Sequence, residues 1–414
     1  MAWNIAFLSI HGDPLAPLGG SHHGGQNVYV KELSRYLGAL GLKVDVYSRR
    51  ESPRQDSHQK YSRGAAVYRI PAGPPEVIQK EKTLSLLPEI ASWIQGRISE
   101  RGDPYRLIHS HYYFSGAVGL DLKRVSGTPL VHTFHSLGAV KQSALQDLDS
   151  SPDTRFEIEQ KICRGADRII ATCQQEKIDL ITHYQAPPEK INIIPCGVNL
   201  ELFQPQDQLQ AKSEIGYTRN DFLITFIGRL EERKGIDTLL EAASQIQDAD
   251  LQILIVGGPP TKKAFLNRSD LDQPAYRHYR DLVTAYRLED QVTFVGGKPQ
   301  THLSTYYSAA DVTVIPSYYE PFGLTALEAL ACSSPVIASR VGGLQSTVQE
   351  GRVGALFEPR QADQLAEKIR IFQDHPEMRV KFRKNARPYV EEHFSWINVS
   401  KQIALLYREL TGDG

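Results

Sequence analysis

Hydrophobic positions along the chain predict repeated β-α units. Short apolar runs alternate with amphipathic segments, which is the pattern of parallel strands connected by helices. Between the first two runs, Val30, Leu33, Leu37 and Leu40 recur at helical spacing and predict a helix over 28–40. In the first half the expected strands are Asn4 to Ile10, Val44 to Tyr47, Leu107 to Ser110, Leu130 to Phe134, Arg168 to Thr172 and Ile191 to Ile194.

A second series of strands follows a polar segment. Residues 203–220 have weak patterning, which predicts a linker between an N-terminal domain, 1–202, and a C-terminal domain, 203–394. Two such doubly wound α/β domains would bind ligands at the carboxyl ends of their sheets, in a shared cleft. The second-half strands are expected at Phe222 to Ile227, Leu251 to Val256, Val292 to Val295, Val312 to Pro316, Val336 to Ala338 and Ala355 to Phe357.

Length and composition predict a globular protein of two domains. The 414 residues exceed what one core usually organises, and 41% of them are hydrophobic. Lys and Arg total 47 against 48 Asp and Glu, so no basic excess points to nucleic acid or an anionic membrane. Scattered cysteines, a first segment without signal-peptide features and the lack of a bilayer-length apolar run favour a cytoplasmic protein with reduced thiols.

A glycine-rich segment precedes the first predicted helix. Gly24 and Gly25 would let backbone amides approach a phosphate at the positive end of that helix. The same glycines also suit a surface loop with turns, and the pattern alone leaves both interpretations open.

The second domain begins with FIGRLEERKG, in which Arg229 and Lys234 follow a buried strand. Two cations at that edge of a sheet can neutralise a diphosphate and stabilise it as it leaves. Glu231, Glu232 and Arg233 surround them, so a solvated charged loop is the alternative.

The segment EPFGLTALEAL has the most specific pattern for ligand binding. Glu320 lies in a loop, and Gly323, Leu324 and Thr325 would form the first helical turn, where the helix dipole suits phosphate oxygens. Glu328 lies eight residues beyond Glu320, inside the helix. We expect both carboxylates to face one ligand, one bonded to sugar hydroxyls and the other to a ribose diol.

His135 ends a hydrophobic strand of the first domain, in VHTFHSLGAVK. At that position it would point toward a reacting sugar, although a structural histidine is an equally good interpretation of one residue.

Together these motifs resemble the retaining glycosyltransferases of family 4, which have the two-domain GT-B fold. GGQNVYVKEL, HTFHSLGAVK, GRLEERKG and EPFGLTALEAL occur in the family's order and cover nearly the whole chain. The resemblance implies that His135, Arg229, Lys234 and Glu320 are catalytic, and that the last helix, 395–412, returns to the first domain. It assigns donor binding to Gly25, Arg229, Lys234, Gly323, Leu324, Thr325 and Glu328.

Two subgroups that glycosylate phosphorylated acceptors are nearest. Gln26 resembles sucrose-phosphate synthases, which use UDP-glucose and fructose 6-phosphate, whereas HSHYYFSG resembles the inositol-phosphate N-acetylglucosaminyltransferases of the mycothiol pathway. Ser136 departs from the threonine of the second subgroup and, with Gln26, favours the first. The resemblance places the acceptor phosphate among Lys80, Tyr112, Ser136 and Arg155, with Gln26 also on the acceptor side.

The resemblance implies no metal and no cofactor beyond the nucleotide-sugar substrate. Two DxD strings, at 147–149 and 270–272, follow no clear strand end and are interpreted as loops. No haloacid-type phosphatase domain follows residue 414, so a separate phosphatase is expected to act on the product. A nucleotide-sugar epimerase or hydrolase and a non-catalytic sugar-phosphate sensor are the rival functions; the acceptor cluster disfavours the first, and His135 with Glu320 disfavours the second.

Overall fold

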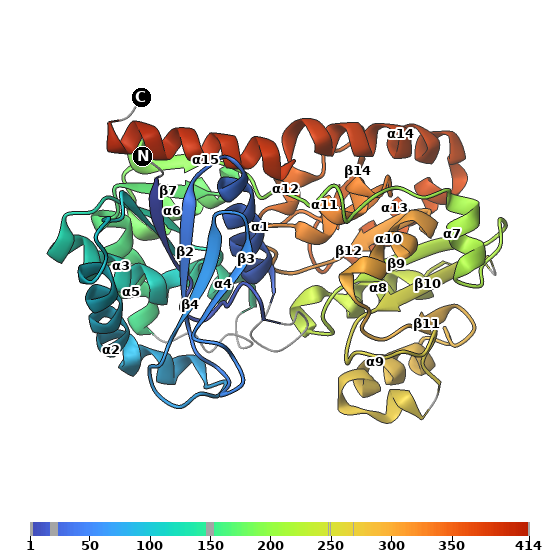
Figure 1. Cartoon of the computed structure of the whole chain (residues 1–414). Helices are drawn as coiled ribbons and strands as arrows, with labels where there is room; N and C mark the ends of the chain where they lie inside the picture. Colours follow the sequence, from blue (N-terminus) through green and yellow to red (C-terminus); the bar gives the residue numbers. More distant parts are fainter. Residues whose placement is uncertain are drawn as a thin grey trace. The chain divides into compact units, whose positions relative to one another are not determined.

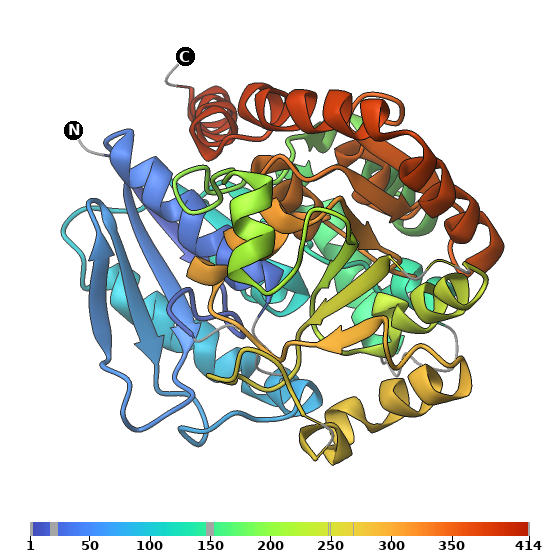
Figure 2. The same ribbon diagram turned by 90° about the vertical axis from the view of Figure 1, so that its right-hand side faces the viewer.

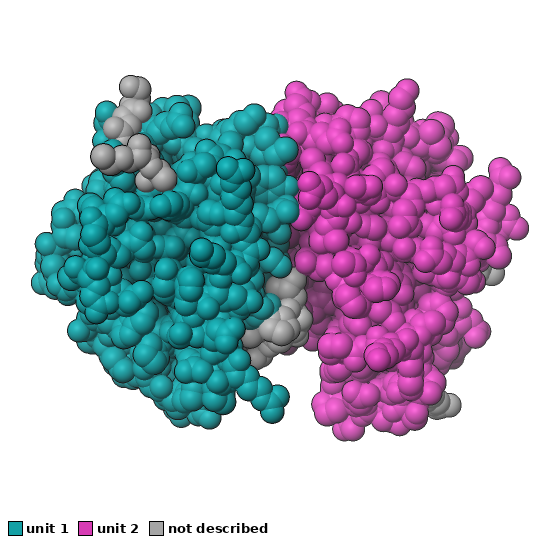
Figure 3. Space-filling view, viewed as in Figure 1, with its two compact units in different colours: residues 1–196, 396–414 teal, residues 197–395 magenta. Residues whose placement is uncertain are grey.

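A computed structural model of the chain describes residues 3–16, 24–145, 153–246, 248, 250–267 and 269–412. They form two compact units, of which unit 1 comprises residues 1–196 and 396–414 and unit 2 comprises residues 197–395 (Figure 3). Both units are Rossmann-like, as the alternation of strands and helices predicts. The boundary lies between Cys196 and Gly197, somewhat earlier than the predicted division at 202 and 203.

Unit 1 is built on an eight-stranded sheet in the order β3-β4-β2-β1-β5-β6-β7-β8. All neighbours pair in parallel except β3 and β4, which are antiparallel. The six expected strands are confirmed, and β3 and β4 are additional. The strands are β1 (Asn4–Leu8), β2 (Lys43–Arg49), β3 (His58–Ser62), β4 (Ala65–Ile70), β5 (Leu107–His111), β6 (Leu130–Thr133), β7 (Arg168–Ala171) and β8 (Ile191–Ile193).

Helices cover both faces of this sheet (Figure 1). On one face α2 packs against α3 and α3 against α5, and on the other α1 packs against α15, the last helix of the chain. Tyr407 of α15 bonds the ring of His109 at 2.6 Å, which ties this helix to β5. The helices are α1 (Gly25–Ala39), α2 (Lys80–Ser99), α3 (Tyr112–Ser126), α4 (Gly138–Leu145), α5 (Asp153–Gly165), α6 (Gln174–Tyr184) and α15 (Trp396–Thr411).

Unit 2 is a fully parallel sheet in the order β11-β10-β9-β12-β13-β14. Its strands match the six expected ones to within one residue at each end: β9 (Phe222–Ile227), β10 (Leu251–Val256), β11 (Val292–Phe294), β12 (Val312–Ile315), β13 (Val336–Ser339) and β14 (Gly354–Phe357). Its helices are α7 (Gln208–Glu214), α8 (Ile236–Ser244), α9 (Pro274–Ala285), α10 (Gln300–Ala309), α11 (Leu324–Ala331), α12 (Leu344–Thr347), α13 (Ala362–Asp374) and α14 (Pro376–His393). Within the described part of the chain, no helix is both long and apolar enough to cross a bilayer.

The strand order of each sheet reverses at one point. In unit 1 the reversal falls between β1 and β5, and in unit 2 between β9 and β12. Helices that follow the two central strands therefore lie on opposite faces, and in doubly wound sheets ligands bind outside the carboxyl ends of such strands. The loops at these two places are where a ligand is expected.

The predicted linker over 203–220 is wrong. Phe203 is buried, and α7 lies beside α10 (Figure 2). Lys212 of α7 forms a buried ion pair with Asp311 at 2.6 Å. Helix α7 is too short to show a hydrophobic periodicity. In the sequence Lys212 resembles a surface residue, because its partner Asp311 lies far along the chain.

We predict that Lys212→Ala destabilises unit 2 by about 3 kcal/mol, because the buried carboxylate of Asp311 loses its nearest charged partner and keeps only Arg379, at 3.8 Å. Scanning calorimetry should show the unit 2 transition at a lower temperature. The matched control is Arg124→Ala, which removes an exposed pair with Asp121 and should leave the transitions in place. A Lys212→Ala protein as stable as this control would contradict the packing of α7 described above.

Candidate active site

Two loops of unit 2 lie together where the strand order reverses. Residues 228–235 connect β9 to α8, and residues 316–323 connect β12 to α11. The amide of Tyr318 donates to the carbonyl of Arg233 at 2.8 Å. Gly235 has φ +67°, and a Cβ there would lie 2.0 Å from a carbonyl oxygen of the second loop. Only glycine therefore permits this close approach.

A buried ion pair joins the same two loops. The ammonium of Lys234 donates to Oε2 of Glu320, and both side chains are almost inaccessible to solvent. Burial alone would raise the pKa of Glu320, but Lys234, Arg233 and the amide of Gly323 outweigh it and hold that pKa below its ordinary value. Burial lowers the pKa of Lys234, which Glu320 partly offsets. The two groups therefore lie together as a buried ion pair.

Arg229 lies at the start of the first loop and is more accessible than Lys234. Its Nη1 contacts Glu231 at 2.6 Å, and the other oxygen of Glu231 accepts from Arg233 at 2.8 Å. Arg233 also donates to the carbonyl of Tyr319. Burial lowers the pKa of Arg229. The alternative of a solvated charged loop is wrong for Lys234, and Glu231 is the residue that holds the two arginines.

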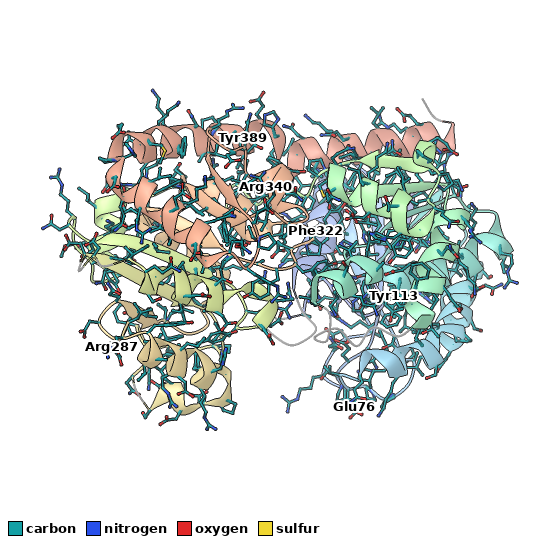
Figure 4. All side chains as sticks on the ribbon, turned by 180° about the vertical axis from the view of Figure 1, so that it is seen from behind. Glu76, Tyr113, Arg287, Phe322, Arg340 and Tyr389 are labelled. Atoms are coloured by element: carbon teal, nitrogen blue, oxygen red, sulfur yellow. The ribbon has the colours of Figure 1, made fainter. Side chains whose placement is uncertain are left out.

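Helix α11 begins directly after Glu320. Gly323 is its N-cap, with φ +74°, and no acidic residue occupies the first turn, which includes Leu324 and Thr325. The loop after β13 supports this turn, because the amide of Gly343 donates to the carbonyl of Glu320 at 3.0 Å. Figure 4 labels one residue of each loop, Phe322 before α11 and Arg340 after β13. The positive end of the helix dipole is thus held beside Lys234.

Glu328 belongs to the same cluster through α11. Tyr307 of α10 donates its hydroxyl to Oε2 of Glu328 at 2.9 Å. Burial raises the pKa of Glu328 to about 7, with opposite contributions from Lys234, which lowers it, and Glu320, which raises it. Lys234 and Glu320 are thus close enough to Glu328 to influence its pKa, while the prediction that both glutamates face one ligand stays a prediction.

This part of unit 2 can bind a polyhydroxylated anion. Arg229, Lys234 and the N-terminus of α11 supply positive charge and amide donors for phosphate oxygens. Glu320 and Glu328 supply acceptors for hydroxyl groups. Among the described residues, no cluster of three or more His, Cys, Asp or Glu side chains is arranged to hold a metal ion.

In unit 1 the structure brings together three of the proposed acceptor residues. Nη2 of Arg155 donates to the carbonyl and to Oγ of Ser136, at 2.7 and 3.0 Å, and the guanidinium lies over the ring of Tyr112. Arg155 is buried, and its Nε donates to Glu159 at 2.7 Å. Arg155 is therefore also a structural anchor for Ser136, a role that the sequence does not reveal.

The other two acceptor residues lie at helix N-termini. Gln26 is in the first turn of α1, and its side-chain amide donates to Oγ of Ser9 at 3.2 Å. Lys80 is the first residue of α2, but its side chain lies outside the described residues. That Lys80 joins Tyr112 and Ser136 stays a prediction.

Two residues at strand ends have left-handed backbone conformations. Tyr112 has φ +72° directly after β5, and His135 has φ +63° just beyond β6. Burial lowers the pKa of His135 far below its ordinary value, so this ring is neutral at physiological pH. Its Nε2 lies 2.9 Å from Nδ1 of His111. Such backbone conformations in neighbouring loops are typical of functional sites.

The glycine-rich loop before α1 is described at its two ends only, because residues 17–23 lie outside the described residues. Gly24 is the N-cap of α1 and Gly25 its first residue. The amide of Gly24 donates to the side chain of Asn27, which in turn donates to the carbonyl of Asp13. Asp13 is held by a buried ion pair with Arg69 at 2.6 Å. These contacts fix both ends of the loop.

Sequence reasoning missed the supporting residues Tyr307, His111 and Glu159. Tyr307 and His111 lie on other elements than their partners Glu328 and His135, and Glu159 lies one helical turn from Arg155. No motif in the sequence marks these contacts. The string at 147–149 lies outside the described residues, and Asp270 and Asp272 form an exposed turn with surface ion pairs.

Two family models match the chain. The model described as Glycosyltransferase Family 4 matches residues 23–202, and the one described as Glycosyl transferases group 1 matches residues 207–389. Each match lies almost entirely within one of the two units.

Known proteins resemble the chain over its whole length. A curated relative from Catenulispora acidiphila, D-inositol 3-phosphate glycosyltransferase 1, is 36% identical and the alignment covers 99% of this chain and 96% of the relative. A solved structure of sucrose-phosphate synthase from Thermosynechococcus elongatus is 38% identical, covers all of both chains and has a TM-score of 0.89. The Anabaena protein HepE, solved in complex with UDP-glucose, shares the fold at 19% identity with a TM-score of 0.72, covering 98% of this chain and 99% of that one.

The free energy of unfolding should depend less on pH in the Glu328→Gln variant than in the wild type. The pKa of Glu328 rises from its ordinary 4.5 to about 7 on folding. Its contribution to the free energy of unfolding is therefore fully present below about pH 4.5 and is lost as the pH rises through 7. The variant keeps the hydrogen bond from Tyr307. Its free energy of unfolding should exceed that of the wild type by about 3 kcal/mol at pH 8, with little difference at pH 4.

Denaturant unfolding of both proteins at several pH values measures this difference. Glu176, whose pKa burial also raises to about 7, is present in both proteins, so its contribution cancels. Parallel stability profiles for the two proteins would show that Glu328 is not the buried, protonatable group that the structure indicates.

Proposed function

Because this chain belongs to the family 4 glycosyltransferases, we propose that it moves glucose from UDP-glucose, or another nucleotide-glucose, to fructose 6-phosphate with retention of configuration. The products are sucrose 6-phosphate and the nucleoside diphosphate. We assign donor binding to unit 2 and acceptor binding to unit 1.

The observation that carries the donor assignment is the buried pair of Lys234 and Glu320 beside the N-terminus of α11. In the reaction the bond between the anomeric carbon and a diphosphate oxygen breaks, and a bond from that carbon to an acceptor oxygen forms. The electron pair of the broken bond leaves with the diphosphate, so negative charge develops there, and the proton of the acceptor hydroxyl passes to the departing diphosphate oxygen. Arg229 and Lys234 stabilise that charge without a metal ion, while Glu320 binds the transferred hexose and Glu328 the ribose.

The acceptor assignment rests on a set of groups suited to a phosphate. Tyr112, Ser136 and Arg155 lie together in unit 1, and Lys80 and Gln26 come from the N-termini of two further helices. Gln26 and Ser136 favour fructose 6-phosphate, and the 38% identity to a sucrose-phosphate synthase supports that choice. We expect a separate phosphatase to act on the product.

The second candidate is transfer of N-acetylglucosamine to an inositol phosphate. The observation in its favour is that the curated relative at 36% identity is named a D-inositol 3-phosphate glycosyltransferase. Both candidates use the same donor cluster and a phosphorylated acceptor, so they differ in the sugar groups recognised rather than in the chemistry.

We predict that Arg229→Ala and Lys234→Ala each lower kcat by roughly 100- to 1,000-fold at saturating donor, because each removes a preorganised cation from the leaving diphosphate. Lys234→Ala also leaves Glu320 unpaired, so circular dichroism must first show that the variant is folded. The control is Arg370→Ala, an exposed residue of α13 in the same unit. Turnover of a folded Arg229→Ala protein at the level of this control would refute the diphosphate role.

A matrix of substrates tests the acceptor assignment. UDP-glucose, ADP-glucose and UDP-N-acetylglucosamine are each paired with fructose 6-phosphate, free fructose and inositol 3-phosphate, and products are identified by mass spectrometry. We predict sucrose 6-phosphate from a nucleotide-glucose, and free fructose as a far poorer acceptor, because each hydrogen bond to a charged phosphate contributes about 1.5 to 3 kcal/mol.

Two outcomes of this matrix decide against the proposal. Glycosylation of inositol 3-phosphate with no disaccharide from fructose 6-phosphate would establish the second candidate. Equal rates for fructose and fructose 6-phosphate would show that the unit 1 cluster does not bind a phosphate. Tyr112→Phe and Ser136→Ala are better probes of this cluster than Arg155→Ala, because losing Arg155 would leave the buried Glu159 without its partner.

A further inference from the structure

Arg49 is a buried charged residue of unit 1 to which no role has been assigned so far. It is the last residue of β2, at the carboxyl end of the sheet, and its exposed fraction is 2%. Its amide donates to the carbonyl of Ile10 at 2.8 Å, and its pairing with Ile70 ties it to β4. Burying a guanidinium costs free energy, so the groups that satisfy it indicate what the residue does.

The guanidinium of Arg49 donates to carbonyl oxygens. Nη1 donates to the carbonyl of Pro74 at 2.8 Å and to that of Arg50 at 3.1 Å, while Nη2 donates to the carbonyl of Glu76. The carboxylate of Glu51 is more distant, at 3.8 Å. Burial lowers the pKa of Arg49, and Glu51 and Glu76 act in the opposite direction. One planar side chain thus holds the segment that contains Pro74 and Glu76 at two points.

This segment, residues 71–79, connects β4 to α2 and is mostly exposed. Apart from Ala72 and Ile78, its residues face solvent, and Glu76 is labelled in Figure 4. Three of its nine residues are prolines, which have no N–H to donate, so the segment cannot form a continuous hydrogen-bonded element. Its position therefore depends on the two carbonyls that Arg49 binds.

Helix α2 begins directly after this segment, with Lys80 as its first residue. Gln79 is the N-cap, and within the described residues its side chain makes no capping hydrogen bond. The start of the helix is thus fixed by the preceding segment and not by a cap of its own. A shift of residues 71–79 would move the backbone of Lys80.

From this arrangement we infer that Arg49 is a positioning residue for the acceptor phosphate. It holds residues 71–79 in place and thereby sets where Lys80 enters α2. Arg49 itself does not touch the substrate. The inference rests on the proposed function, which assigns the ammonium of Lys80 to that phosphate. It applies to fructose 6-phosphate and to an inositol phosphate alike, because both acceptors carry the group.

Hydrogen exchange of the full-length protein tests the anchoring without substrate. Arg49→Met removes the donors at similar side-chain length, and Arg49→Lys keeps the charge without the planar fork. We expect faster exchange at residues 76–84 in Arg49→Met and a smaller effect in Arg49→Lys, which carries the comparison if Arg49→Met does not fold. The control is Arg50→Ala, whose side chain donates to the carbonyls of Ser52 and Pro53 and should leave residues 76–84 unchanged.

Steady-state kinetics test the effect on the acceptor. Arg49→Met should lower kcat/KM for the phosphorylated acceptor by about tenfold or more, mainly through KM, because a hydrogen bond to a charged phosphate is weakened. The same acceptor without its phosphate should lose little, and so should KM for the nucleotide sugar. Equal losses for the phosphorylated and the free acceptor would show that Arg49 has a structural role only.

A double-mutant cycle tests whether Arg49 acts through Lys80. Lys80→Ala should show the same selective loss, and the protein with both Arg49→Met and Lys80→Ala should be no worse than Lys80→Ala alone. Losses that add in the double variant would overturn the inference, and so would unchanged exchange at residues 76–84 in both Arg49 variants.

Failure of the inference and failure of the proposed function give different results. If Lys80→Ala lowers kcat/KM for the phosphorylated acceptor and folded Arg49→Met does not, the function stands and the role of Arg49 is wrong. If the wild type neither transfers a sugar to fructose 6-phosphate or inositol 3-phosphate nor binds either one in titration calorimetry, the function and the inference both fail.

Discussion

The ion pair between Lys234 and Glu320 is the interaction on which the site in unit 2 depends. It joins the loop after β9 to the loop after β12, the two strands between which the sheet order reverses. Because both groups are buried, removing either would leave an uncompensated charge, so the pair fixes the two loops relative to each other. Around this ion pair lie Arg229, the N-terminus of α11 and Glu328. If the proposed function holds, the positive charge that meets the diphosphate is preorganised before any ligand arrives.

Unit 1 uses the same principle with different residues. Its sheet reverses between β1 and β5, and buried polar pairs again fix the loops near that point. Asp13 and Arg69 hold the start of the glycine-rich loop, and Glu159 holds Arg155 against Ser136. In both units, charged side chains that look like surface residues in the sequence are buried. They support the residues that would touch a substrate.

Most of the fold could be predicted from the sequence, because buried parallel strands are continuous apolar runs that need no knowledge of their partners. The exceptions have physical causes. The edge strand β3 is mostly exposed and has no apolar run, in β4 Tyr68 and Arg69 interrupt one, and α7 is too short to show a period. For the site, a motif such as EPFGLTALEAL could identify Glu320 and Glu328. It could not show that Lys234 or Tyr307 would contact them, since those contacts join distant segments.

The central claim is that the loops held by Lys234 and Glu320 bind a nucleoside diphosphate, and hydrogen exchange tests it most directly. Backbone amide exchange, followed by mass spectrometry with and without UDP, reports which segments of the full-length protein are protected. The account predicts slower exchange in unit 2 at residues 228–235 and 321–328, with the opposite ends of the β9 and β12 strands unchanged. Unchanged exchange in both loops at saturating UDP, or protection confined to other parts of unit 2, would contradict it.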